Sequence, residues 1–219
     1  MRAKKLGVSE PRRLPEDMGP ILQALGEADP ALKRAIKAVG AFVLPGKPAD
    51  LQAFVRAIIG QQLSVKVAGT ISDRLCLQAG RGAEMTPESI LCVPMEQMRA
   101  VGLSQAKAES IRALAAFWRD QELSAEKIEA MADEELVALL TQVRGIGPWT
   151  VKMVQMFCLR RPDILPVEDL GLKMGIQRLD GLAERPTVRE MVERAEVWRP
   201  WRSVATWYLW KLLLVKGEW

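Results

Sequence analysis

Apolar residues recur along most of this chain with the spacing of an amphipathic α-helix. Between residues 51 and 59 they fall at positions i, i+3, i+4, i+7 and i+8: Leu51, Phe54, Val55, Ile58 and Ile59. This spacing gathers the side chains on one helical face that can be buried. Strand signals are weak, because no alternating apolar–polar run exceeds four residues and no Asn-Gly hairpin dipeptide occurs. The pattern predicts an all-α fold.

Residues that favour helix N-termini stand before several of these segments. In chain order they are Ser64, Thr86, Ser104 and Thr187. Pro87, directly after Thr86, suits the first turn of a short helix. Glu190, three residues after Thr187, completes the sequence of a capping box. We therefore expect helices to begin at these four positions.

A helical hairpin is predicted over residues 136–158. Its two apolar faces consist of Leu136, Leu139, Leu140 and Val143 and of Val151, Val154, Phe157 and Cys158. Between them lie Gly145, Ile146, Gly147 and Pro148. The two glycines permit backbone angles closed to other residues, and the proline suits the first turn of the second helix. Such a turn presents backbone N–H groups at a helix N-terminus, which is a phosphate-binding arrangement. An ordinary connection between two helices would show the same Gly-x-Gly.

Two adjacent acids, Glu168 and Asp169, follow the hairpin at the expected start of another helix. The loop before them is punctuated by Pro162 and Pro166. Taken alone, acids in this position are best explained as helix caps, because they interact favourably with the N–H groups and the dipole of the first turn.

The composition narrows the chemistry. The 219 residues include no histidine, which excludes imidazole bases, Ser-His and Cys-His pairs and histidine metal sites. Lysine and arginine number 31 against 27 acids, a balance that permits a polyanionic partner without requiring one. The three cysteines are widely spaced, so we expect small buried thiols and neither disulfides nor metal clusters. They are Cys76, Cys92 and Cys158.

The sequence shows no signal for export or for membrane insertion. Its polar, basic start lacks the apolar segment of a signal peptide. The longest apolar stretch, residues 204–215, is interrupted by Lys211 and is too short to span a bilayer. We expect a cytoplasmic protein without a membrane partner, associated with the nucleoid if the source is bacterial.

Four segments in one consistent order resemble the helix-hairpin-helix (HhH-GPD) DNA glycosylase superfamily, and within it the AlkA-type 3-methyladenine branch. Residues 140–150 read L-x-x-V-R-G-I-G-P-W-T, and residues 165–173 read L-P-x-E-D-x-G-x-K. Residues 195–203 read A-E-V-W-R-P-W-R-S, and residues 56–64 read R-A-I-I-G-Q-Q-L-S. The match covers roughly residues 20–215.

The resemblance implies two helical lobes flanking a DNA-binding cleft. Residues 48–156 would form a central bundle that ends in the helix-hairpin-helix. Residues 20–47 and 157–219 would form a second lobe that carries the catalytic aspartate, and residues 1–19 an N-terminal arm.

The implied activity is that of a monofunctional glycosylase of base excision repair. It would flip alkylated bases such as 3-methyladenine and 7-methylguanine out of double-stranded DNA and hydrolyse them off, leaving an abasic site. Asp169 would be the catalytic carboxylate, which stabilises positive charge on the sugar. Glu168, which points elsewhere on the helix, is expected to be a cap or a helix-start acid. The substrate pocket would be lined by Trp149, Trp210 and Met153. Four further tryptophans are expected to lie in the core and not in the pocket: Trp118, Trp198, Trp201 and Trp207.

The DNA contacts are likewise implied by the resemblance. The turn that fills the gap left by the flipped base would comprise Gln61, Gln62 and Leu63, with Gln62 or Leu63 at its tip. The DNA backbone would be bound by Gly145, Ile146, Gly147 and Thr150, in a salt-sensitive and sequence-independent way. Carbonyl groups in the hairpin would hold a Na⁺ or K⁺ ion, namely those of Thr141, Val143 and Ile146.

Departures from related enzymes limit the assignment. Met153 stands where the best-known bacterial member has a pocket tyrosine, which leaves the preferred base open. Trp149 occupies the place of the catalytic lysine of glycosylase/lyases, and no cysteine follows Cys158 to build an iron–sulfur cluster. These features predict a monofunctional, metal-independent hydrolase without a cofactor, which we expect to act as a monomer. The alternatives are a helix-hairpin-helix glycosylase for uracil or an oxidised purine, a non-catalytic DNA-binding scaffold, and a helical protein-interaction domain.

Overall fold

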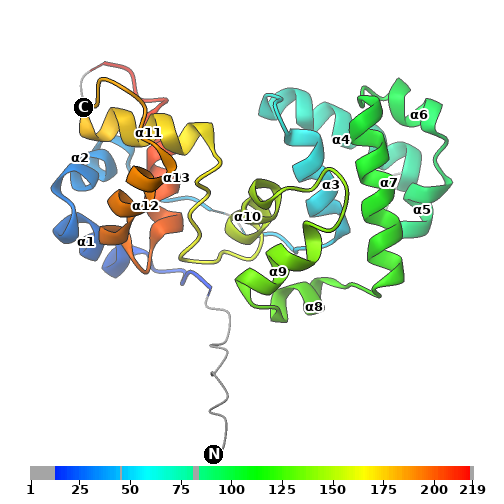
Figure 1. The fold of residues 1–219 in the computed structure, drawn as a ribbon, viewed down its shortest axis with the longest axis horizontal. Coiled ribbons are helices and arrows are strands. Elements are labelled where there is room, and N and C mark those ends of the chain that lie inside the picture. Colours follow the sequence, from blue (N-terminus) through cyan, green and yellow to red (C-terminus); the bar gives the residue numbers. More distant parts are fainter. Residues whose placement is uncertain (1–12, 45, 81–83, 218–219) are drawn as a thin grey trace, which may run out of the picture. The chain divides into compact units, whose positions relative to one another are not determined.

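The computed structural model describes residues 13–44, 46–80 and 84–217. All regular elements in these ranges are helices and none is a strand (Figure 1). The prediction of an all-α fold is therefore confirmed. In the described part of the chain, none of the helices combines the length and the apolar character needed to cross a membrane.

The chain divides into two compact units, and each is described by itself below. The first comprises residues 47–154, and the second joins residues 12–46 to residues 155–219. The sequence expectation placed the central bundle at residues 48–156. Helix α10 (Pro148–Phe157) contributes its first seven residues to the first unit and its last three to the second.

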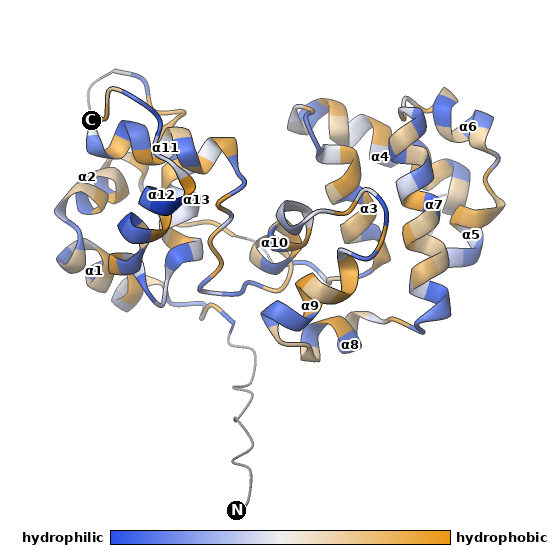
Figure 2. Cartoon of the chain, viewed as in Figure 1, coloured by the Kyte–Doolittle hydropathy of each residue, from blue (hydrophilic) through white to orange (hydrophobic). Residues whose placement is uncertain are grey.

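The first unit consists of small helices around α7. Besides the start of α10, its helices are α3 (Leu51–Gly60), α4 (Val65–Gly80), α5 (Pro87–Cys92), α6 (Met95–Ala100), α7 (Gln105–Asp120), α8 (Ala125–Ala130) and α9 (Asp133–Leu140). Helix α3 packs against α4 and α7, and α5 packs against α7. The apolar positions predicted for α3 are all buried, and the ring of Phe54 lies 5.7 Å from that of Trp118. Hydrophobic and hydrophilic stretches alternate around these helices (Figure 2), as amphipathic packing requires.

The predicted helix starts are confirmed. The Ser104 hydroxyl accepts a hydrogen bond from the N–H of Lys107 at the start of α7. Thr86 caps α5 in a capping box with Ser89. The same arrangement joins Thr187 to the residue three positions later, as predicted. These elements form where expected because their signals are local in the sequence.

The second unit has its own core. Its helices are α1 (Gly19–Ala28), α2 (Pro30–Val39), α11 (Leu170–Asp180), α12 (Val188–Ala195), the 3₁₀ turn η1 (Glu196–Trp198) and α13 (Arg202–Leu212), together with the end of α10. Helix α13 packs against α2 and α11. Trp198 and Trp207 are buried in this core, as predicted, whereas Trp201 is only half-buried against it.

Two expectations are corrected here. The N-terminal arm was predicted to extend to residue 19, but Leu14 and Met18 belong to the buried core of the second unit, and Gly19 begins α1. Residues 1–12 of that arm lie outside the described residues. Cys92 is exposed at the end of α5, although all cysteines were expected to be buried thiols. An apolar sequence neighbourhood does not bury a residue whose position points away from the core.

A buried carboxylate ties α2 to α12 and η1. One oxygen of Asp29 accepts from the N–H groups of Ala31 and Leu32 at 3.0 and 3.1 Å. The other accepts from Arg194 at 2.6 Å and from the indole of Trp198 at 2.8 Å. Burial by itself would raise the pKa of Asp29, but these hydrogen bonds outweigh burial and hold the pKa below its usual value.

Candidate functional site

The predicted hairpin is formed by α9, α10 and the turn between them. Gly145 has a φ of +84°, and a Cβ atom there would collide with the hydroxyl of Ser110, so only glycine fits. Gly147 departs from the prediction, because its φ is outside the left-handed region and a Cβ would meet nothing within 4 Å. Gly145 therefore sets the turn, whereas Gly147 only keeps its surface clear.

Two N–H groups predicted to face a phosphate have partners inside the hairpin. The N–H of Ile146 donates to the carbonyl of Val143 at 3.0 Å, and that of Thr150 to the carbonyl of Gly147 at 3.0 Å. The side chains of Ile146 and Thr150 are buried. These two residues shape the hairpin from within, which leaves the N–H groups of Gly145 and Gly147 as the candidates for phosphate contact.

The turn between α3 and α4 carries the predicted intercalating residues. Gln62 has a left-handed backbone with a φ of +58° and is exposed, and Leu63 is 38% exposed. Gln61 behaves differently, because its Nε2 donates to Oγ1 of Thr150 at 2.9 Å and to the carbonyl of Gly145 at 3.3 Å. Of the three predicted residues, Gln62 and Leu63 thus face solvent, while Gln61 attaches the turn to the hairpin.

The predicted catalytic carboxylate begins α11. Asp169 is the N-cap residue, and its Oδ2 accepts from the N–H of Leu172 at 2.6 Å. The same oxygen accepts from the indole Nε1 of Trp210 on α13 at 2.7 Å. Glu168 was expected to be a cap or a helix-start acid. The structure gives the N-cap position to Asp169, because the cap must directly precede the first helical residue. Capping therefore orients the carboxylate and does not compete with a catalytic role.

Glycine at position 171 is required for this contact. A Cβ atom there would lie 2.9 Å from Oδ2 of Asp169 and 2.9 Å from Cδ1 of Trp210. Real Cβ atoms do not approach neighbours this closely, so the indole can reach the carboxylate only across a residue without a side chain. This close approach explains why the L-P-x-E-D-x-G-x-K segment has glycine at position 171.

An aromatic partner of Trp210 was missed from the sequence. Phe157, which is 37% exposed at the end of α10, stacks on Trp210 with ring centroids 5.6 Å apart and planes 10° apart. Within the second unit, the structure thus brings together Asp169, Trp210 and Phe157. Phe157 was assigned to an apolar face of the hairpin, although its four-residue spacing from Met153 could have grouped it with the pocket residues.

The other two predicted pocket residues lie earlier on α10. Trp149 is half-buried and Met153 is buried, and both belong to the part of the helix assigned to the first unit. Trp149, Met153 and Phe157 follow one another at intervals of four residues. They therefore lie along one side of a single helix.

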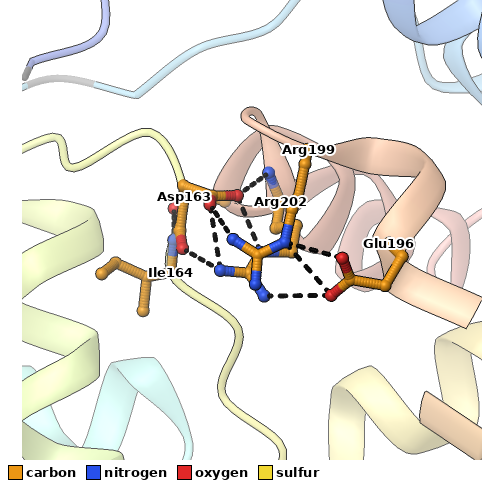
Figure 3. Close-up of polar contacts among 6 residues, drawn as sticks. Asp163, Ile164, Glu196, Arg199 and Arg202 are labelled. Atoms are coloured by element: carbon orange, nitrogen blue, oxygen red, sulfur yellow. Dashed lines mark hydrogen bonds and ion pairs between the residues drawn. The ribbon is translucent and has the colours of Figure 1, made fainter. Parts of the chain in front are cut away.

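An ion-pair network fixes the loop that leads to Asp169. The carboxylate of Asp163 binds Arg199 at 2.7 Å and Arg202 at 2.7 Å, and Glu196 binds Arg199 at 2.9 Å. Figure 3 shows the carboxylates of Asp163 and Glu196 on opposite sides of the two guanidinium groups. The Ser203 hydroxyl also accepts from a loop N–H at 2.9 Å. The segment around residues 195–203 thus anchors this loop to the start of α13, the helix that carries the indole partner of Asp169.

The similarity to known proteins agrees with this geometry. Residues 55–200 match the profile of the family described as HhH-GPD superfamily base excision DNA repair protein. The DNA-3-methyladenine glycosylase 1 of Schizosaccharomyces pombe is 35% identical over 192 residues, which cover 85% of this chain and 84% of the relative.

Solved structures show the same relationship. The structure of Schizosaccharomyces pombe 3-methyladenine DNA glycosylase in complex with abasic DNA superposes with a TM-score of 0.82 at 34% identity, covering 88% of this chain and 95% of that one. A DNA-3-methyladenine glycosidase from Bacillus halodurans superposes with a TM-score of 0.76 at 34% identity, covering 88% of each chain. The family match, which spans well over half of the sequence, confirms the resemblance. The chain belongs to the HhH-GPD superfamily of base excision DNA repair proteins.

Proposed function

We propose that this protein is a monofunctional DNA glycosylase that removes alkylated bases, 3-methyladenine above all, from double-stranded DNA. The observation that carries the proposal is the Asp169 carboxylate, held by the Leu172 N–H and by the Trp210 indole, on which the exposed Phe157 ring stacks. The relatives named above are 3-methyladenine glycosylases, and one of them was solved on abasic DNA.

The reaction follows from the position of the carboxylate. The bond from the sugar carbon C1′ to the base nitrogen breaks, and its electron pair leaves with the base. Positive charge develops on the sugar, and the fixed anion of Asp169 stabilises that charge. A water molecule then forms the new bond to C1′, and its proton passes to Asp169 or to the departing base. The hydrogen bonds from the Leu172 N–H and the Trp210 indole to Oδ2 orient the carboxylate before the reaction begins.

The aromatic pair suits a cationic leaving group. An N-alkylated purine such as 3-methyladenine carries a positive charge, which an electron-rich indole attracts by stacking and by cation–π interaction. Trp210 and Phe157 offer this surface next to Asp169. The family resemblance also assigns Trp149 and Met153 to base recognition, and methionine in place of a tyrosine there would tune the choice of base.

The proposed DNA contacts are divided between two turns. Gln62 and Leu63 fill the gap left by the flipped base, and the N–H groups of Gly145 and Gly147 bind backbone phosphate. The protein would act as a monomer, in the compartment that holds the DNA, which is the nucleoid region if the source is bacterial.

A monovalent cation would fit the hairpin. The carbonyl of Val143 accepts one hydrogen bond, from Ile146, and a carbonyl oxygen has a second lone pair for an ion. Elsewhere in the described residues, no group of three or more cysteine or acidic side chains could hold a metal. The carbonyls of Thr141, Val143 and Ile146 would hold Na⁺ or K⁺, which would supply a fixed positive charge near a phosphate.

The test compares the wild-type protein with Asp169→Asn on methylated duplex DNA, counting released bases. Asparagine keeps a capping oxygen for α11, so the variant should fold and bind DNA while its excision rate falls roughly 10²-fold or more. If the wild type binds DNA but releases no alkylated base, the assignment of alkylated substrates is wrong. Uracil and oxidised-purine duplexes then decide between a glycosylase for another lesion and a DNA-binding scaffold.

A further inference from the structure

A half-buried lysine of α7 binds the end of α3. Nζ of Lys107 donates to the carbonyl of Ile59 at 2.8 Å and to that of Gln61 at 2.7 Å. The last carbonyls of a helix have no partner within the helix, and a cation there also complements the helix dipole. Burial lowers the pKa of Lys107, as expected for an ammonium group withdrawn from water. Lys107 therefore fixes the backbone directly before the exposed turn of Gln62.

The same face of α7 supports the hairpin. Ser110, three residues after Lys107, lies directly beneath Gly145. Residues three positions apart share one side of a helix. The side chain of Gln61 closes the connection, because it reaches both Gly145 and Thr150. One side of α7 thus holds the two segments of the first unit that are proposed to touch DNA.

We propose that Lys107 and Gln61 are positioning residues that fix the Gln62–Leu63 turn against the hairpin before DNA arrives. This inference rests on the proposed function. If the turn had to become ordered during binding, the affinity of the protein for DNA would be lower. Each side chain that is immobilised on binding would reduce this affinity by roughly three- to tenfold. The cost would fall only on complexes in which the turn enters the duplex, since hairpin contacts with the DNA backbone do not involve the turn.

The experiment measures binding to two duplexes of one sequence by fluorescence anisotropy. One duplex is undamaged, and the other carries a tetrahydrofuran abasic analogue whose gap the turn can fill. Lys107→Met should weaken binding to the abasic duplex about tenfold and leave binding to the undamaged duplex unchanged. Gln61→Ala should act in the same direction with a smaller effect, about threefold. Lys107→Arg keeps a cation with several donors and should restore most of the preference.

The chain offers a matched control. Nζ of Lys127 donates to the carbonyl of Glu122 at 2.7 Å, in the connection between α7 and α8. Lys127→Met therefore also removes a hydrogen bond from a lysine ammonium to a backbone carbonyl, but away from the Gln62–Leu63 turn. This variant should keep the wild-type preference for abasic DNA. If Lys107→Met fails to fold, as judged by circular dichroism, Gln61→Ala at a half-buried position decides the question.

Two results would overturn the inference. The first is that Lys107→Met and Gln61→Ala both prefer the abasic duplex over the undamaged duplex as strongly as the wild type does. The second is an equal loss on both duplexes, which would show that Lys107 only stabilises the fold. Excision of 7-methylguanine by the wild type is measured alongside. A wild type that excises nothing and shows no preference contradicts the proposed function as well, whereas an active wild type with unaffected variants contradicts the positioning role alone.

Discussion

The indole N–H of Trp210 donates to Oδ2 of Asp169 at 2.7 Å, across 41 residues of sequence. Phe157 covers the same indole. Trp210 therefore touches the carboxylate through its edge and the aromatic neighbour through its face. The two requirements of the proposed reaction, an oriented anion and a stacking surface, meet in one side chain.

These two roles can be separated with Trp210→Phe. Phenylalanine keeps a ring for stacking on Phe157 but lacks the N–H. A hydrogen bond to a charged group contributes about 1.5–3 kcal/mol, so the single-turnover excision rate should fall by roughly one to two orders of magnitude, with DNA affinity retained. Trp207→Phe is the control, since Trp207 lies on the same helix with its ring against Phe42. Equal rates for wild type and Trp210→Phe would remove the hydrogen bond from the mechanism.

Gly171→Ala should damage the site with little effect on the fold. The added methyl group would push the indole from the carboxylate, because the available separation is only 2.9 Å. We expect the excision rate to fall at least tenfold, as is typical when a catalytic group is displaced by about an ångström. Gly69→Ala in α4, where a Cβ meets nothing within 4 Å, should leave the rate unchanged. Thermal melts would show whether either variant is unfolded.

Asp163→Asn should loosen the loop before Asp169. The change removes the charge that binds two arginines, of which Arg202 is mostly buried. We expect the free energy of unfolding to fall by about 1–2 kcal/mol, together with a lower excision rate. Glu196→Gln, at a more exposed carboxylate of the same network, should cost less than about 0.5 kcal/mol. Urea denaturation of both variants measures the difference, and a larger loss for Glu196→Gln would refute this ranking.

The stability of the protein should depend on pH through Asp29. Its pKa in the folded state lies below the ordinary value of 3.8, so the folded protein holds the carboxylate more strongly in its charged form than the unfolded chain does. This contribution is present above pH 3.8 and is lost as the pH falls through the lower, folded-state pKa. Wild type should therefore exceed Asp29→Asn in unfolding free energy at pH 7. Denaturation curves recorded toward pH 3 and below should show that difference shrinking, and a constant difference would contradict the assignment.

The elements predicted correctly from the sequence are those with local signals. Thr187 and its capping partner lie three residues apart, and the apolar stripe of α3 repeats within ten residues. The role of Asp169 could be inferred only from a family resemblance, because its partner Trp210 lies 41 residues away. Phe157 and Lys107 were missed for a related reason. Both have ordinary helical positions, and their contacts depend on how helices pack.

The hairpin shows the limit of reading residue types alone. Two glycines in one turn predicted two special backbone conformations, yet only Gly145 has one. Gln62, a proposed DNA contact, has a left-handed backbone although it is not a glycine. The residue types around Gln62 do not predict this conformation. Intrinsic preference could not reveal that conformation, because tertiary bonds around the turn impose it.

The backbone of Gln62 also bears on how this protein can change. A left-handed conformation costs a residue with a side chain about 1 kcal/mol, and glycine at that position would recover much of this energy. A search for heat-resistant variants would therefore favour glycine at position 62 and discard the side chain proposed to enter DNA. Thermal robustness and repair would be selected in opposite directions at this one residue.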